Sequence, residues 1–331
     1  MLFNLLQAAE TAAEIPAQAF ENCVSLKNFD FSHVEKIGTV AFFNVPLDEN
    51  LVLENVTHLG DMAFAEKDNH RLKSLTAPKL TYVGAQAFAN CTKLKEFIAP
   101  MVEEIGDVAF ANTALVEFEI GVNLKKIGLN VFDGSKRLEA FYSVVDDNKV
   151  YDVVYEEAMI AEGVLYTQGN NGYVLAYYPC AKADEEFTLA DGTVRIGFGA
   201  LMGNQHLRKI TLSSQLTNIG NFAFYGCDNL ATVVFKSYYA PTLEGTMSGE
   251  IPKLTPETVP DFPGFEQLYK YDYEYIIGGE LLYPFYYSNF KAGIGSQGAQ
   301  GMTAVLPDNC EGYDSLLYTA YFTVTQEETS G

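Results

Sequence analysis

The sequence of 331 residues contains no tryptophan and only four histidines and five cysteines. It has no H-E-x-x-H motif or comparable pair of histidines, so metal binding and histidine acid–base catalysis lack support. A G-x-S-x-G motif and a P-loop are also missing. The glycines Gly293, Gly295 and Gly298 have a dinucleotide-like spacing, but no strand-to-helix context surrounds them. We therefore predict a non-enzymatic protein without a cofactor or a metal.

Two acidic clusters offer the oxygen ligands that calcium prefers, namely Asp146-Asp147-Asn148 and Asp184-Glu185-Glu186. Neither cluster has the glycine and the distal glutamate of a calcium loop. We expect both clusters to lie in solvated turns.

Basic residues are scarce, with 21 Lys and Arg against 43 Asp and Glu and a formal net charge of −22. Nucleic acids and anionic membranes bind through clustered Lys and Arg, so this charge argues against both partners. It favours solubility and leaves cationic partners or calcium as options. No apolar run approaches the ~18 residues of a membrane span. Residues 1–6 are apolar but lack the basic residues and the long hydrophobic segment of a secretory leader.

The chain does contain a sequence motif that recurs every 22 to 24 residues. The aligned position returns as Leu201 and Phe224 after an interval of 69 residues, which is three steps of 23. An apolar residue followed by glycine keeps the same interval, as in Ile37-Gly38 and Val83-Gly84. A period of about 20–29 residues is typical of leucine-rich repeats. The anchor phenylalanines of the regular part are Phe20, Phe42, Phe64, Phe88, Phe110 and Phe132.

Each repeat is interpreted as one coil of a solenoid. Nine and eleven residues after the anchor come two apolar residues, such as Phe97 and Ala99, and this alternation predicts a short strand with one buried face. Stacked coils would pair these strands in parallel, while the Ala-Phe segments would form short helical or 3-10 turns on the opposite side. The glycine of each apolar-Gly pair is expected at a bend with positive φ. A single coil cannot bury its apolar face, so we expect stability to come from stacking.

None of the five cysteines lies in a C-x-x-C pair. Three of them, Cys23, Cys91 and Cys227, follow the anchor by three residues, and Val45 and Thr113 fill that position in other coils. We expect a small apolar slot inside the stack, with free buried cysteines rather than disulfides or metal ligands.

The run Ile-Gly-x-x-Ala-Phe-x-x-Cys-x-x-Leu resembles the BspA-like leucine-rich repeat proteins of gut and oral bacteria. The segment from Leu26 to Phe31 matches the general leucine-rich consensus. The resemblance covers about residues 15–240 and implies a leucine-rich repeat solenoid with a parallel β-sheet on one face. It also implies an extracellular or cell-surface location and, as for some members, adhesion. The usual Asn or Cys of the consensus is replaced by Val34, Val56, Leu80 and Val102.

Three regions are predicted along the chain. Residues 1–14 carry apolar residues at helical spacing and are interpreted as an N-terminal capping segment. Residues 15–240 form the solenoid, and its irregular repeat at 143–190 contains a hairpin signal at Asn170-Asn171-Gly172. Residues 241–331 are interpreted as a tyrosine-rich C-terminal cap or a small appended domain.

The outward strand residues are the predicted partner-binding surface, because solenoids present extended sheets to their ligands. The leading hypothesis is a binding or adhesion protein whose partner is a protein, a host matrix component or a glycan. The predicted contact residues are Asn28, Asp30, Asn50, Thr76, Glu96, Ile98, Glu117, Glu119 and Tyr142.

One alternative is a carbohydrate-recognition module whose aromatic strand stacks on sugar rings. Packing of this strand as part of the C-terminal cap onto the last coil is the simpler interpretation, and the absence of tryptophan weakens the sugar hypothesis further. A further alternative is a structural spacer in a larger surface protein. The tyrosines of the aromatic strand are Tyr269, Tyr271, Tyr273 and Tyr275.

Overall fold

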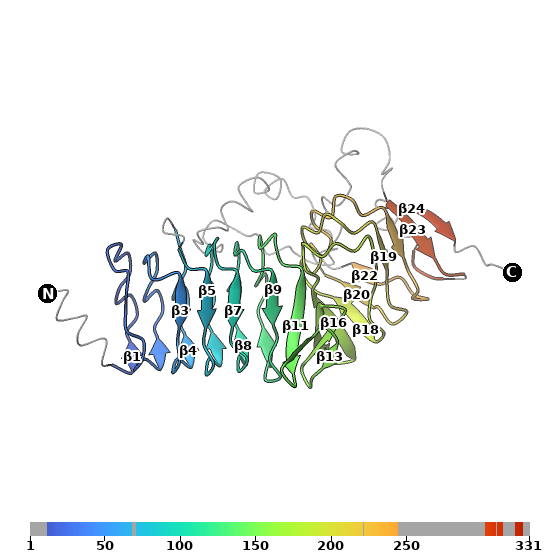
Figure 1. Ribbon diagram of the computed structural model, residues 1–331. Helices are drawn as coiled ribbons and strands as arrows, with labels where there is room; N and C mark the ends of the chain where they lie inside the picture. Colours follow the sequence, from blue (N-terminus) through green and yellow to red (C-terminus); the bar gives the residue numbers. More distant parts are fainter. Residues whose placement is uncertain are drawn as a thin grey trace, which may run out of the picture. The chain divides into compact units, whose positions relative to one another are not determined.

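The computed structural model describes residues 12–67, 71–220, 222–243, 302–308, 310–313 and 322–326. These residues belong to two compact units, 1–164 and 165–331. Each unit consists of stacked coils whose short strands pair mainly in parallel (Figure 1). The predicted leucine-rich repeat solenoid is therefore confirmed.

In the first unit, a short strand lies directly before each apolar-Gly glycine, and before Pro16 in the first coil, and these strands build a narrow parallel sheet. The register aligns Ile37 with Leu59 and Leu59 with Val83, so each apolar residue lies one coil from the next. All three side chains are buried. This narrow sheet adds a second parallel face to the one that the sequence predicts. Its strands are β1 (Glu14–Ile15), β2 (Lys36–Ile37), β4 (His58–Leu59), β6 (Tyr82–Val83), β8 (Glu104–Ile105) and β10 (Lys126–Ile127).

The predicted strands that follow the anchors form the wide side of the first unit. Their central residues, Leu51, Leu75 and Phe97, are buried, while the residues on either side face outward. This confirms the period-2 alternation read from the sequence. Strands β3 (Asn50–Val52), β5 (Ser74–Thr76) and β7 (Glu96–Ile98) pair in parallel, and so do β9 (Glu117–Glu119) and β11 (Ala140–Val145).

The anchor phenylalanines form a continuous stack through the first unit. The rings of Phe42 and Phe64 lie 5.6 Å apart with planes 7° from parallel, and those of Phe64 and Phe88 lie 5.7 Å apart. Rings from the wide strands meet this stack edge-on, as Phe97 does against Phe110 at 4.7 Å. Such pairs contribute about 0.5–1.5 kcal/mol each beyond the burial of apolar area.

The segments predicted as short helical or 3-10 turns form a succession of turns, and no helix occurs among the described residues. The cause is a left-handed backbone two residues before each anchor phenylalanine of the first unit, and in most coils also two residues after it, which interrupts any helical run. Val40 and Val108 adopt it with φ of 60°, although β-branched residues are strained there. The residues with positive φ before the anchor are Gln18, Val40, Met62, Gln86, Val108 and Asn130, and those after it include Asn22, Asn44, Asn90 and Asn112.

The glycine of the apolar-Gly pair does not sit at a positive φ, so that prediction is wrong. The structure gives it a different role, because a Cβ at Gly84 would lie 2.5 Å from the carbonyl carbon of Gly60. A Cβ at Gly106 would lie equally close to the amide nitrogen of Ala85. The glycines therefore permit the close approach of successive coils.

The position three residues after the anchor is small in most coils, as predicted, but it is not simply apolar. The thiol of Cys91 donates to the carbonyl of Phe64 in the preceding coil, and Cys227 donates to Leu201 in the same way. The hydroxyl of Ser135 donates to the carbonyl of Phe110 over 2.7 Å. We call this position the donor slot. All five cysteines are free.

The second unit begins with the predicted hairpin. Strands β15 (Val164–Gly169) and β16 (Gly172–Tyr177) pair antiparallel with Gly169 opposite Gly172. In a separate sheet of this unit, β16 pairs in parallel with β18 (Thr193–Ile196), β18 with β20 (Asn218–Ile219), and β20 with β22 (Thr242–Leu243). The wide sheet of this unit contains β17 (Glu186–Thr188), β19 (Lys209–Thr211), β21 (Thr232–Val234), β23 (Met302–Leu306) and β24 (Phe322–Gln326).

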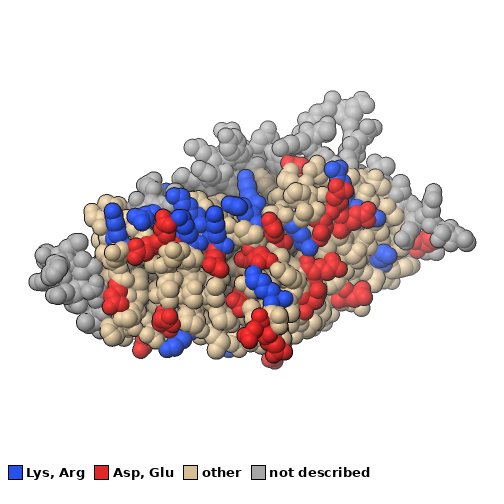
Figure 2. Space-filling model, viewed as in Figure 1, with Lys and Arg blue, Asp and Glu red and all other residues tan. Residues whose placement is uncertain are grey.

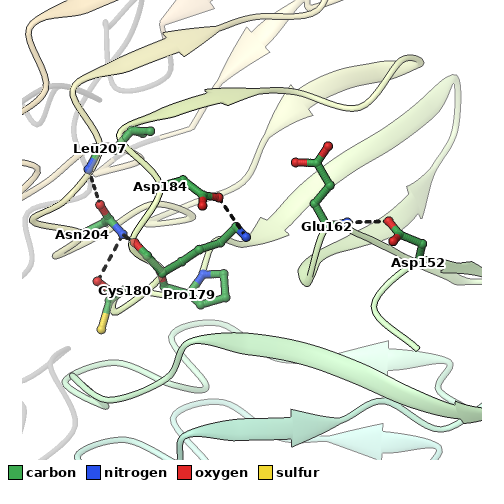
Figure 3. A network of polar contacts seen from close by, with 8 residues as sticks. Asp152, Glu162, Pro179, Cys180, Asp184, Asn204 and Leu207 are labelled. Atoms are coloured by element: carbon green, nitrogen blue, oxygen red, sulfur yellow. Dashed lines mark hydrogen bonds and ion pairs between the residues drawn. The ribbon is translucent and has the colours of Figure 1, made fainter. Parts of the chain in front are cut away.

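Tyr178 accounts for the last of the three steps in the irregular interval. Its amide donates to the carbonyl of Ala200, as an anchor amide does to the next coil, and its ring packs on Phe187 at 4.8 Å. Tyr178 therefore fills the anchor position 23 residues before Leu201. In the coil of Leu201, Asn204 occupies the donor slot (Figure 3). Its amide donates to Cys180 and its oxygen accepts from the backbone of Leu207.

Candidate protein-binding surface

Four strands of the first unit bring most of the predicted contact residues onto one surface. The register places Asn50 beside Ser74 and Ser74 beside Glu96, and it aligns Thr76 with Ile98. The hydroxyl of Ser74 donates to Asn50 across the strands over 2.7 Å. We call this surface the sheet face. Its residues are Asn50, Thr76, Glu96, Ile98, Glu117 and Glu119.

The wide side also holds a hairpin that the sequence did not reveal. Strand β11 runs beyond the length of the other wide strands and turns back through Asp146-Asp147 into β12 (Asn148–Val150). Both aspartates have positive φ, as a two-residue hairpin turn requires. The acidic cluster that was expected in a solvated turn therefore makes the reversal that carries Lys149 and Tyr151 back along β11.

This hairpin covers one of the predicted contact residues. The ammonium group of Lys149 lies 4.0 Å from the centre of the Tyr142 ring and 2.6 Å from Glu117 Oε2. The Tyr151 hydroxyl donates to Glu117 Oε1 over 2.6 Å. Tyr142 is consequently only 8% exposed instead of facing solvent as predicted. We call these residues, together with Glu119, the tyrosine–lysine cluster.

The two glutamates of the cluster have pKa values shifted in opposite directions. Burial acts to raise the pKa of Glu117, but the hydrogen bonds from Lys149 and Tyr151 outweigh it and leave this pKa lowered. Burial raises the pKa of Glu119, which the charge of Lys149 only partly opposes. Burial and the nearby carboxylates raise the pKa of Tyr142 to about 12, with Glu119 contributing most among the charges. Glu119 is therefore the carboxylate whose charge is least compensated.

Two of the predicted contact residues lie apart from these strands. Asn28 and Asp30 are exposed, and the segment that holds them has no strand partner among the described residues. The Asp30 side chain instead accepts a hydrogen bond from the Ser32 backbone over 2.9 Å, which lowers its pKa. Tyr269, Tyr271, Tyr273 and Tyr275 of the carbohydrate hypothesis lie outside the described residues.

The sheet face presents carboxylates, an amide, a hydroxyl and the half-buried Ile98. No group of three or more His, Cys, Asp or Glu is placed to hold a metal within the described part of the chain. In that same part, no helix has the length and apolar character needed to cross a membrane.

Sequence reasoning missed Lys149 and Tyr151. Both follow Asp146-Asp147, whose residue types suit a two-residue hairpin turn, and both alternate with residues of the opposite face. The turn was therefore recognisable in the sequence. Its effect was not, because Lys149 and Tyr151 reach Glu117 only when β12 pairs with the end of β11.

Solved structures of other repeat proteins share this fold. A leucine-rich cell-surface protein from Faecalibacterium prausnitzii matches with a TM-score of 0.53 at 24% identity, covering 70% of this chain and 73% of its own. A leucine-rich repeat protein from Bacteroides ovatus matches at 0.51 and 24% identity, covering 70% and 54%. The pneumococcal vaccine antigen PcpA matches at 0.50 and 25% identity, covering 61% of this chain. The chain thus spans about half the length, 51%, of that antigen.

A family model gives the assignment. No curated protein matches the chain. The model of the BspA type leucine-rich repeat region matches residues 10–141 and 175–245, with six copies. These ranges cover more than half of the sequence. The chain belongs to the BspA-type leucine-rich repeat family.

Proposed function

We propose that this protein binds a protein ligand at the cell surface or in the extracellular medium, through the sheet face of its first unit. The role is recognition, including adhesion, without catalysis. The F. prausnitzii match is described as a cell-surface protein and PcpA as a vaccine antigen, and both descriptions support a surface location.

The observation that carries the proposal is the partial burial of Glu119 without a fully compensating cation within the described part of the chain. This carboxylate is half-buried on the sheet face, its pKa is raised, and it forms no ion pair with any described residue. A cation brought by a partner would favour the charged form that burial disfavours. Glu96 lies on the neighbouring strand β7 and adds a second, exposed carboxylate.

These features specify the chemistry of the ligand. A partner with Lys or Arg side chains would find Glu96 and Glu119 available, and Ile98 would contact its apolar atoms. Lys149 already shows how an ammonium group fits this environment, because it lies over the Tyr142 ring and bonds to Glu117. We therefore expect a protein ligand with a basic contact surface.

The test begins with a panel of purified extracellular-matrix proteins, measured with and without calcium. For each saturable hit, the double variant Glu96→Lys/Glu119→Lys is compared with Glu14→Lys/Glu35→Lys. The control pair changes the net charge equally, but its residues are exposed beside the narrow sheet. We expect at least about tenfold weaker binding for the sheet-face variant and less than about twofold for the control.

Equal affinities for the two variants, with unchanged circular dichroism spectra, would place the binding surface elsewhere. Equal losses in both would mean that net charge alone governs binding.

A further inference from the structure

Four basic residues gather at one corner of the first unit, where the wide strands begin. Arg71 and Lys73 flank the buried Leu72, and Lys93 and Lys95 flank the buried Leu94. Because the leucines between them point into the core, the cations are held at the surface. We call the four residues the basic corner. Figure 2 shows Lys and Arg side chains gathered along this rim, above strands β3 to β9.

The register of the coils sets the spacing of these charges. The amide of Lys95 donates to the carbonyl of Lys73 over 2.8 Å, so the two residues occupy the same position in adjacent coils. Parallel strands lie about 4.8 Å apart, and the two pairs of cations repeat at about that interval. The basic corner is thus a row of positive charge running across the coils.

A buried carboxylate holds part of the backbone of the basic corner in place. The carboxylate of Glu66, which is 5% exposed, accepts hydrogen bonds from the amides of Arg71 at 3.3 Å and Leu72 at 3.5 Å. These bonds hold the backbone that carries Arg71 in place, which reduces the entropy that this segment loses when a ligand binds.

Most of this positive charge is uncompensated. Lys73 pairs with Glu49 at 2.5 Å, while Arg71, Lys93 and Lys95 form no ion pair with any described residue. The hydrogen bond from Lys73, the charge of Lys73 and then those of Arg71 and Lys93 lower the pKa of Glu49, so these cations act together on one anion. Lys93 and Lys95 are exposed.

We propose that the basic corner binds a linear anionic glycan whose sulfate or carboxylate groups repeat along the polymer. A row of cations spaced by the coils suits a chain that presents one anionic group after another. The residues at 71–73 and 93–95 include no aromatic side chain, so the corner lacks the stacking surface on which single-stranded nucleic acids depend. The basic corner borders the sheet face, because Lys95 precedes Glu96 in the chain, but it needs no protein ligand there.

The experiment measures binding of the full chain to a heparin oligosaccharide at about 50 mM salt, where surface charges are weakly screened. The variant Lys93→Glu/Lys95→Glu is compared with Lys36→Glu/Lys126→Glu. The control residues are exposed on the narrow sheet and change the net charge by the same amount. Single-stranded DNA of about 30 nucleotides serves as the nucleic-acid probe.

We expect saturable heparin binding that weakens as salt rises, at least about tenfold loss in the corner variant and less than about twofold loss in the control. No binding by the unmodified chain, or equal losses in both variants, would overturn the proposal. DNA binding of equal strength, lost in the same corner variant, would also overturn it in favour of a nucleic-acid site. Should the reversal variant lose its circular dichroism spectrum, Lys93→Gln/Lys95→Gln provides the decisive comparison.

Discussion

The hydroxyl of Ser135 donates to the carbonyl of Phe110, which lies 25 residues earlier in the chain and one coil away in the stack. The same hydroxyl oxygen accepts the Thr113 amide at 3.0 Å. One small side chain thus satisfies two buried backbone groups. Replacing Ser135 with Ala leaves the Thr113 amide without this acceptor, and an unsatisfied buried donor costs about 1–3 kcal/mol. We expect urea denaturation to give a free energy of unfolding lower by that amount. Ser25→Ala, at an exposed position, serves as the control and should change it little.

Close approach between coils makes the glycines sensitive to a single methyl group. A Cβ at Gly106 would lie 2.5 Å from the Ala85 nitrogen and 2.7 Å from the Gly84 carbonyl carbon. We expect Gly106→Ala to lower the free energy of unfolding by at least about 2 kcal/mol, because backbone atoms cannot yield as flexible side chains do. Gly203 has φ of +79°, and a Cβ there would meet no atom within 4 Å, so Gly203→Ala should cost only the left-handed strain of about 1–2 kcal/mol. Equal costs in thermal unfolding would contradict the steric explanation.

Val108 offers a stabilising substitution. Its φ of 60° is unfavourable for a β-branched residue, and the aligned residue in the next coil, Asn130, adopts φ of 52°. Asn tolerates this conformation well. We expect Val108→Asn to raise the free energy of unfolding by about 1 kcal/mol and Asn130→Val to lower it similarly, as read from paired melting curves. A destabilised Val108→Asn variant would show that the packing of the valine outweighs its backbone strain.

Asp133 should make stability fall as pH rises. Burial raises its pKa to about 6 from an ordinary value of 3.8, so the folded state holds the proton more tightly than the unfolded state. The protonated side chain therefore costs nothing below about pH 4, the cost of ionising it grows between about pH 4 and 6, and it is constant above that range. Because the side chain is partly exposed, we discount the penalty to about 1–2 kcal/mol at pH 7. Asp133→Asn should be more stable than the unmodified chain at about pH 7 and equal to it near about pH 3.5. Denaturant titrations at both pH values test this, and an unchanged difference between them would reject the linkage.

Much of the fold follows from periodicity, because residues one period apart share one environment in a stacked coil. The period placed Leu51, Leu75 and Phe97 in the core and their neighbours outside, and the structure agrees. It does not identify which force acts at a repeated position. A recurring glycine is compatible with a positive φ or with a steric contact, and only the distance between Gly84 and Gly60 distinguishes the two. The donor slot is a similar case, because cysteine is both a small apolar residue and a weak hydrogen-bond donor.

The candidate surface was predictable only where the repeat is regular. The outward positions of β3, β5, β7 and β9 follow from alternation along each strand. The burial of Tyr142 depends on Lys149, which returns from a hairpin outside the repeat. Lys149 does not occupy a repeated position of the coils. The repeat that predicts the sheet face therefore could not predict that Lys149 covers Tyr142.

The donor slot also gives the stack a polarity. Anchor amides donate forward, as Phe42 does to Ala63, whereas slot side chains donate backward, as Cys91 does to Phe64. Within the described coils, the thiols of Cys91 and Cys227 thus reach a carbonyl of the coil before them, while anchor amides reach a carbonyl of the coil after them. The two directions along the stack are therefore chemically different. Duplicated coils can lengthen such an array only in one orientation, which makes repeat number an adjustable property while the direction of the stack stays fixed.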